Sequence, residues 1–237
     1  MNSPDDSGTD ESRDFDHAYY ADLIEQGGLQ ESVIAVARGL RIDVGPASEL
    51  PELDVRDWSV AAFQSPRGEM RIILGQDKRR FSISLDSDHR FVWASGSTTD
   101  LVEAAEVLHA WKQGVTLQAL HSRFPFMEFD RLSLAYEEGN EVETQWEITL
   151  GDDSFQAYRE LLLKLHAHER FREMFPFFSH WTLGLAKSSR TNEAGEIFIR
   201  PSGEGYSLWS HSTPSQKEKF SDIDDLINAA AHLAANL

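Results

Sequence analysis

VLHAWKQGVTLQALHSRFPFM, residues Val107 to Met127, is the stretch that decides the fold. It holds the end of one helix, a second short helical segment and a proline between two phenylalanines. Apolar residues spaced three and four apart predict the first helix from Leu101 to Lys112, with Asp100 as its N-cap. Gly114 favours the end of that helix, and Pro125 ends the next one. We therefore expect two helices followed by a rigid aromatic turn.

The aromatic turn has a counterpart at Phe175-Pro176-Phe177-Phe178, after a helix expected from Ser154 to Arg172. Two rings beside a proline form a stiff group that is buried at little entropic cost, so each favours a corner of the core. The alternative is a ligand pocket between the two groups, to which two histidines would add titratable side chains. Its candidate residues are His121, Phe124, Phe126, Phe177, His180 and Trp181.

Outward from these turns, apolar or alternating runs separated by turn sequences predict antiparallel strands. Four lie in the first half, at residues 58–63, 70–74, 81–85 and 91–94, and three in the second, at 181–186, 196–200 and 206–209. A helix over 221–237 closes the second half, as 101–112 closes the first. At an offset of 125 residues, Asp100-Leu101 matches Asp225-Leu226, and Trp93 and Trp58 match Trp209 and Trp181 at smaller offsets.

This order predicts an α+β fold built from two pseudo-duplicated halves, each a helix, an antiparallel meander and a closing helix. The expected divisions are a disordered acidic tail over 1–16, an N-terminal half over 17–114, a helical connector over 115–153 and a C-terminal half over 154–237. The tail is rich in Asp, Glu, Ser and Gly and has too little apolar surface to fold. An all-helical insert, Phe129 to Leu150, breaks at Gly139-Asn140.

Composition narrows the classes of function. The net charge of −18 argues against nonspecific binding to nucleic acid and favours either simple solubility or a basic protein partner. The absence of cysteine indicates a reducing compartment and removes thiolate chemistry. We see neither a signal peptide nor an apolar run long enough to span a membrane, so we expect a cytoplasmic protein without a membrane partner.

The residues that carry chemistry form no recognisable catalytic pattern. His166 and His168 stand two apart on a helix and face different directions, so they do not make a metal site. We find no serine elbow, Walker sequence or dinucleotide fingerprint. The basic triplet Lys78-Arg79-Arg80 is interpreted as exposed turn residues or as a contact to the acidic tail. We therefore expect no catalytic residue, metal or cofactor.

Three segments carry a resemblance to a known family: HAWKQGVTLQALHSRFPFMEF, the AYEEG helix followed by Trp146, and FREMFPFFSHWTLGLA. Together they resemble an actinobacterial family of unknown function that carries the label "natural product biosynthesis protein". The resemblance extends over about Trp58 to Ala186. It implies an association with biosynthetic gene clusters and supplies no catalytic residues.

Two hypotheses of function follow. The first is a non-enzymatic protein-interaction module, an immunity-like or chaperone-like binder of a basic partner, whose encounter opposite charge would accelerate. The second is an accessory protein or enzyme of natural-product biosynthesis that uses the pocket between the halves. A homodimer would serve to bury an exposed sheet edge.

Overall fold

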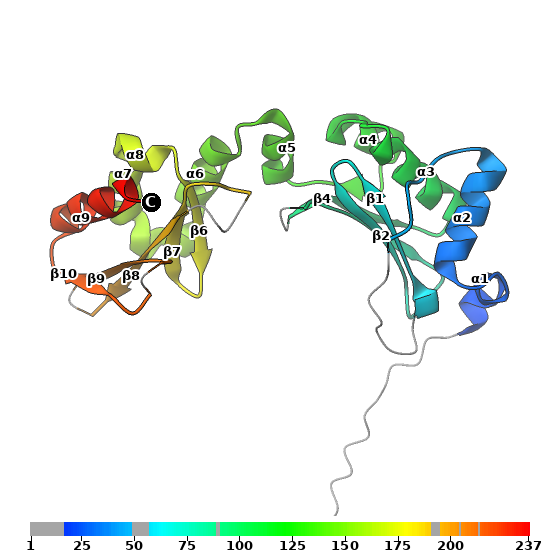
Figure 1. The fold of residues 1–237 in the computed structure, drawn as a ribbon, viewed down its shortest axis with the longest axis horizontal. Coiled ribbons are helices and arrows are strands. Elements are labelled where there is room, and N and C mark those ends of the chain that lie inside the picture. The colour runs from blue at the N-terminus through cyan, green and yellow to red at the C-terminus, as the bar shows by residue number, and fades with distance from the viewer. Residues whose placement is uncertain (1–16, 49–56, 89–90, 191–194, 204, 213) are drawn as a thin grey trace, which may run out of the picture. The chain divides into compact units, whose positions relative to one another are not determined.

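The computed structural model describes residues 17–48, 57–88, 91–190, 195–203, 205–212 and 214–237 (Figure 1). The chain divides into two compact units, Met1–Phe129 and Asp130–Leu237. The predicted acidic tail lies outside the described residues. The boundary between the units lies inside residues 115–153, which were predicted to form a helical connector. Each unit is therefore described by itself.

Along the sequence of unit 1, helices come both before and after the strands. The helices before the strands are η1 (His17–Tyr20), α1 (Ala21–Glu25) and α2 (Leu29–Leu40), and the short turn η2 (Asp57–Ser59) leads into the sheet. After the strands come α3 (Leu101–Lys112) and α4 (Leu117–Arg123). The Asp100 side chain accepts a hydrogen bond from the Val102 amide at 2.7 Å, which confirms the predicted N-cap of α3.

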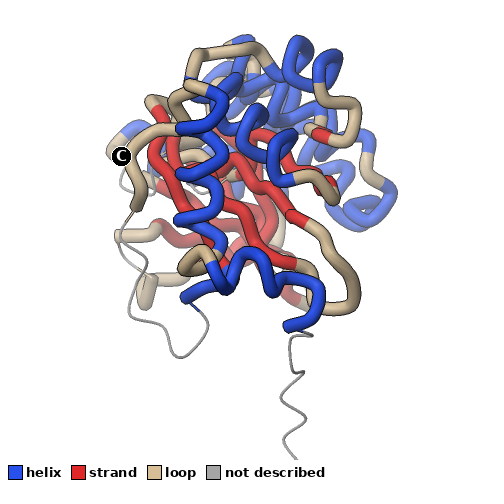
Figure 2. The backbone as a smooth tube through the Cα atoms, turned by 90° about the vertical axis from the view of Figure 1, so that its right-hand side faces the viewer, coloured by secondary structure: helices blue, strands red, loops and turns tan. Residues whose placement is uncertain are grey.

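Sheet 1 is an antiparallel meander in the order β1-β2-β3-β4-β5. Its strands are β1 (Val60–Ser65), β2 (Gly68–Leu74), β3 (Phe81–Asp86), β4 (Val92–Thr98) and the short β5 (Met127–Glu128). The first four confirm the predicted meander. Alternation in β3 buries Phe81, Ile83 and Leu85, and α2 and α3 cover that face, as Figure 2 shows with helices in front of strands.

Unit 2 begins with a series of helices separated by only a few residues. They are α5 (Arg131–Glu138), α6 (Glu141–Gly151), η3 (Asp153–Tyr158), α7 (Arg159–Ala167) and α8 (Glu169–Arg172), and α9 (Ile223–Ala235) follows the strands. The prediction of one continuous helix over 154–172 is wrong. The segment forms three short helices, with breaks near Tyr158 and His168. Gly139 ends α5 in the left-handed region, which confirms the predicted break.

Sheet 2 is also an antiparallel meander, in the order β10-β9-β8-β7-β6. Its strands are β6 (Phe175–Ser179), β7 (Thr182–Ala186), β8 (Glu196–Ser202), β9 (Gly205–Ser210) and β10 (Glu218–Phe220). The predicted aromatic corner at Phe175–Phe178 is therefore an edge strand, and Pro176 stands where a proline costs the ladder least. Leu183, Leu185, Ile197 and Ile199 face a core formed with α6, α7 and α9.

The two units share the predicted plan of helices, antiparallel meander and closing helix, so the α+β fold is confirmed. The closing helices correspond differently from the predicted offset of 125. Their N-caps are Asp100 and Asp222, and 222 − 100 gives an offset of 122. Trp58 precedes the first strand of its sheet whereas Trp181 lies between the first two, so this matched pair is not structurally equivalent.

Within the described residues, no helix combines the length and apolar character needed to cross a membrane.

Candidate functional site

The six candidate pocket residues are divided between the units. His121, Phe124 and Phe126 belong to unit 1, and Phe177, His180 and Trp181 belong to unit 2. His121 is exposed, and its Nδ1 lies 2.7 Å from the Met127 carbonyl oxygen, to which it donates. Phe124 is buried. A shared pocket between the halves stays a prediction, whereas the three residues of unit 2 do lie on one hairpin.

That hairpin turns at His180 and Trp181. Ser179 pairs with Thr182, so two residues form the loop, and both have positive φ, 47° for His180 and 61° for Trp181. Two central residues with positive φ characterise a type I′ turn, which usually carries Asn and Gly because other side chains are strained there. The Trp181 residue is 64% exposed. The chain therefore holds a large apolar side chain in solvent at a conformational cost.

Contacts from two sides hold this turn in place. The Tyr158 hydroxyl of η3 donates to the carbonyl oxygen of Trp181, and Arg200 Nη2 of β8 donates to that of His180 at 3.0 Å. Beneath the turn, the Phe178 ring stacks on Phe155 with centroids 3.8 Å apart. Burial raises the pKa of the Tyr158 hydroxyl, which keeps it protonated as a donor. Trp181 is thus presented on a rigid support.

The face of sheet 2 turned away from α7 and α9 carries aromatic side chains in one row across the strands. The register aligns Phe177 of β6 with Gly184 of β7, Gly184 with Phe198 of β8, and Phe198 with Trp209 of β9. We call Phe177, Phe198 and Trp209 the aromatic strip, and the sheet surface that bears it the aromatic face. The three rings are partly exposed.

The absence of a side chain at Gly184 leaves room for the Phe177 ring to reach Phe198. A Cβ placed there would lie 2.2 Å from the Phe177 Cζ, so the Phe177 ring occupies the space above Gly184. Phe177 then meets the Phe198 ring edge to face, with centroids 6.1 Å apart, and Phe198 stacks on Trp209 at 5.6 Å. The ammonium of Lys217 lies 4.6 Å from the Trp209 ring centroid. The strip is consequently a packed and ordered apolar surface.

Three exposed residues beside the strip are positively charged. Arg200 and Lys219 align through Ser207 in the neighbouring row, and Lys217 stands at the Trp209 end. In the part of the chain that the structure describes, none of these three cations belongs to an ion pair. Glu196 on the same face lies 3.5 Å from His211 and its side chain is only 12% exposed.

The corresponding face of sheet 1 differs in chemistry. Its cross-strand pairs include Ser82 with Ser97 and Ser84 with Ser95, and two of its charged residues, Arg71 and Glu69, pair with each other. The shared architecture therefore does not account for the aromatic strip, which is a property of unit 2.

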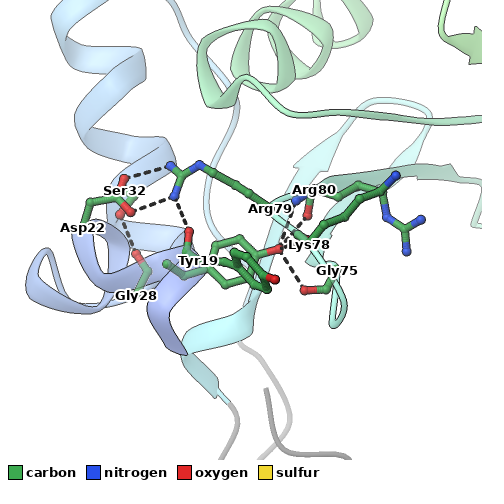
Figure 3. A network of polar contacts seen from close by, with 9 residues as sticks. Tyr19, Asp22, Gly28, Ser32, Gly75, Lys78, Arg79 and Arg80 are labelled. Carbon is green, nitrogen blue, oxygen red and sulfur yellow. Dashed lines mark hydrogen bonds and ion pairs between the residues drawn. The ribbon is translucent and has the colours of Figure 1, made fainter. Parts of the chain in front are cut away.

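The basic triplet has a structural role in unit 1 (Figure 3). Arg79 donates to both carboxylate oxygens of Asp22 in α1, at 2.7 and 2.8 Å, and this contact lowers the Asp22 pKa. The buried Tyr20 hydroxyl accepts from the Arg80 amide at 3.0 Å and lies 2.8 Å from the Gly75 carbonyl oxygen. Arg79 is therefore a clasp between the β2–β3 hairpin and α1, whereas Lys78 and Arg80 are exposed as predicted.

Unit 2 has two open depressions with mixed polar and apolar linings. One of about 500 Å³ lies at α8 and α9, and one of about 550 Å³ lies where the β8–β9 hairpin meets β10, beside Lys219. Among the described residues, no group of three or more His, Asp or Glu side chains could hold a metal ion. Neither depression is lined by any of the six candidate pocket residues.

Phe177, His180 and Trp181 were named from the sequence, but the strip to which Phe177 belongs was missed. A signal was present in Ile197-Phe198-Ile199 and Leu208-Trp209, where large apolar residues occupy consecutive positions of a strand. Consecutive positions point to opposite faces, so such strands are apolar on both.

Comparison with known proteins gives a match over the C-terminal part of the chain. Residues 140–237 match the model of a family described as "Family of unknown function (DUF6193)". No curated protein and no solved structure matches the chain. The matched range includes the whole of sheet 2, the His180-Trp181 turn and the aromatic strip.

Proposed function

We propose that this protein is a protein-binding module and that Trp181 is its anchor residue. The observation that carries the proposal is a tryptophan 64% exposed at the tip of a two-residue turn whose central residues both have positive φ. Tryptophan is enriched among the residues that dominate binding energy at protein interfaces. Folding alone does not select such a residue there.

The strain of the turn supports this function. Left-handed backbone costs a residue other than glycine about 1–2 kcal/mol, and the hairpin would form more readily with Asn and Gly. Strain that the surrounding contacts enforce is characteristic of recognition sites, because the bound conformation is prepared in advance. The contacts of Tyr158 and Arg200 with the turn supply that enforcement here.

The charge of the whole chain favours a basic partner, and the acidic residues of unit 2 concentrate on its first helices. Residues 130–153 contain a single basic residue, Arg131. Their acidic residues are Asp130, Glu137, Glu138, Glu141, Glu143, Glu147, Asp152 and Asp153. We propose the cytoplasm as the compartment and, from the resemblance, proteins of natural-product biosynthesis as the first partners to search.

The test is affinity capture from the native host's cytoplasmic extract with three baits. They are the unchanged chain, Trp181→Ala, and Leu163→Ala as a matched control, since Leu163 is a 50% exposed apolar residue on α7 and is not part of the turn. We expect a protein that is retained by the unchanged chain and the control and lost with Trp181→Ala. Repeating the capture at rising salt shows whether charge contributes to binding.

A double variant separates binding from folding. His180→Asn combined with Trp181→Gly installs the favoured type I′ residues, so the fold should be stabilised by about 1 kcal/mol while capture is lost. Equal capture by the unchanged chain and both Trp181 variants would refute the proposed function.

A further inference from the structure

We propose that the aromatic face of unit 2 binds an acidic protein segment that also carries apolar side chains. This inference rests on the proposed function, because the Trp181 turn stands at the end of the same face through the contact of Arg200 with His180. The proposed segment is acidic, whereas the net charge of the chain favours a basic partner.

The aromatic strip supplies the apolar contacts of the proposed site. Core packing already satisfies the other face of sheet 2, where Leu183, Leu185 and Ile199 are fully buried. The strip lies on the remaining face, with three large rings partly exposed side by side. At about 4.8 Å per strand it extends roughly 14 Å from β6 to β9, which is the length of about four extended residues. Contiguous aromatic surface of this kind typifies protein-binding sites.

The charges of the proposed site come from three exposed cations, Arg200, Lys217 and Lys219. None has an ion-pair partner among the described residues, although the chain has an excess of acidic residues that could have paired with them. Arg200 and Lys219 stand on strands two apart, so roughly 10 Å separates their backbones. Carboxylates on a bound segment would form ion pairs with both Arg200 and Lys219.

Local charge outweighs net charge at contact distance. At physiological ionic strength, screening reduces interactions between exposed charges beyond about 8 Å. Arg200 and Lys219 lie in the row of the sheet next to the aromatic strip and Lys217 contacts Trp209, whereas the acidic residues of α5 and α6 lie on helices outside the sheet. An acidic segment is consequently favoured at this face.

The geometry of the rings argues against single-stranded nucleic acid, the other polyanion that binds aromatic sheet faces. Base stacking needs a free ring face. Trp209 lies between Phe198 of β8 on one side and Lys217, which precedes β10, on the other, and its ring contacts both. A protein segment needs only apolar contact with the edges of the rings, which this arrangement offers.

The test begins with selection from a random peptide display library against the full-length chain. We expect selected peptides enriched in Asp and Glu together with aromatic or aliphatic residues. The selected peptides, labelled with a fluorophore, are then titrated with the protein and its variants. Enrichment of Lys and Arg, or no charge bias, would overturn the inference.

The decisive variant is Lys217→Glu with Lys219→Glu, which leaves the Arg200 contact with the turn intact. We expect at least tenfold weaker peptide binding. The matched control is Lys78→Glu with Arg80→Glu, which makes the same change of charge at exposed residues of unit 1 and should alter binding less than twofold. Equal effects of the two double variants would show a general field effect and refute the proposed surface.

Two further titrations separate this inference from the proposed function. Trp209→Ala should weaken the selected peptides, and oligo-dT and oligo-rU should bind far more weakly than those peptides. If Trp181→Ala abolishes capture of a host protein while the Lys217/Lys219 and Trp209 variants leave peptide and host-protein binding unchanged, the proposed function stands and the inference fails. Tighter binding of either oligonucleotide would also overturn it.

Discussion

Replacing Tyr20 with phenylalanine removes a hydroxyl group through which η1 contacts the β2–β3 hairpin, and changes little else. The Tyr20 side chain is 0% exposed, and its hydroxyl accepts from the Arg80 amide at 3.0 Å while lying 2.8 Å from the Gly75 carbonyl oxygen and 2.9 Å from that of Lys78. The phenyl ring remains, so apolar burial is preserved. The variant therefore isolates the polar contacts of the β2–β3 hairpin with η1.

The expected loss follows from the groups left without a partner. The Arg80 amide loses its acceptor and the Gly75 carbonyl loses a donor, whereas the Arg80 carbonyl keeps its bond from the Gly75 amide at 2.8 Å. An orphaned buried polar group costs about 1–3 kcal/mol, and these groups are partly buried, so we expect a loss of about 2–3 kcal/mol. In a unit of this size that lowers the midpoint of thermal unfolding by roughly 10 °C.

The assay combines thermal or urea unfolding with amide hydrogen exchange of residues 75–80, which reports the hairpin directly. Tyr19→Phe is the matched control, because Tyr19 is 39% exposed and precedes Tyr20 in the chain. It should change the free energy of unfolding by less than about 0.5 kcal/mol. An equally small effect of Tyr20→Phe, with unchanged exchange at the Arg80 amide, would refute the reasoning.

Three further changes test contacts in both units. Asp22→Asn removes the carboxylate that Arg79 binds; because that hydrogen bond lowers the folded pKa of Asp22, its stabilisation is present above the unfolded pKa of about 3.9 and lost as pH falls through the folded pKa. With Asp22 half-exposed, we expect a deficit of about 0.5–1 kcal/mol near neutral pH that disappears in acid, and a pH-independent deficit in urea titrations would contradict this cause. Gly184→Val should destabilise unit 2 by about 1–3 kcal/mol, since its Cβ would meet Phe177; adding Phe177→Ala should recover part of that loss in a double-mutant cycle, and strictly additive losses would argue against the contact. Trp146→Phe removes the buried Nε1 donor to the Met174 carbonyl oxygen at 2.9 Å, so chemical denaturation should show a loss of about 2–3 kcal/mol, whereas a loss below 0.5 kcal/mol would mean that water replaces the donor.

The sequence by itself determined the elements whose signals are local. Asp100 caps α3 through an amide two residues away, and the alternation of Phe81, Ile83 and Leu85 marks β3 without reference to any partner strand. Turn residues and helix periodicity likewise reveal the order of helices, meander and closing helix. These signals depend on backbone geometry over a few residues, so they are legible in one segment at a time.

The candidate site was predicted in part for the same reason. His180 and Trp181 drew attention as residues beside an aromatic run, but their positive φ comes from the pairing of Ser179 with Thr182, which the sequence does not state. Asn or Gly at these two positions would have predicted a type I′ turn, but the chain has His180 and Trp181 there. The strain that distinguishes this turn was therefore invisible before the structure.

Only the tertiary structure decided the rest, because it depends on pairing between distant segments. Phe175–Phe178 lacks strand alternation and becomes β6 through its pairing with β7, where Gly184 leaves room for the Phe177 ring. The aromatic strip arises from the register that aligns Phe177, Phe198 and Trp209 across four strands, and no local pattern specifies that register. Side chains far apart in the chain thus form one surface only once the sheet has assembled.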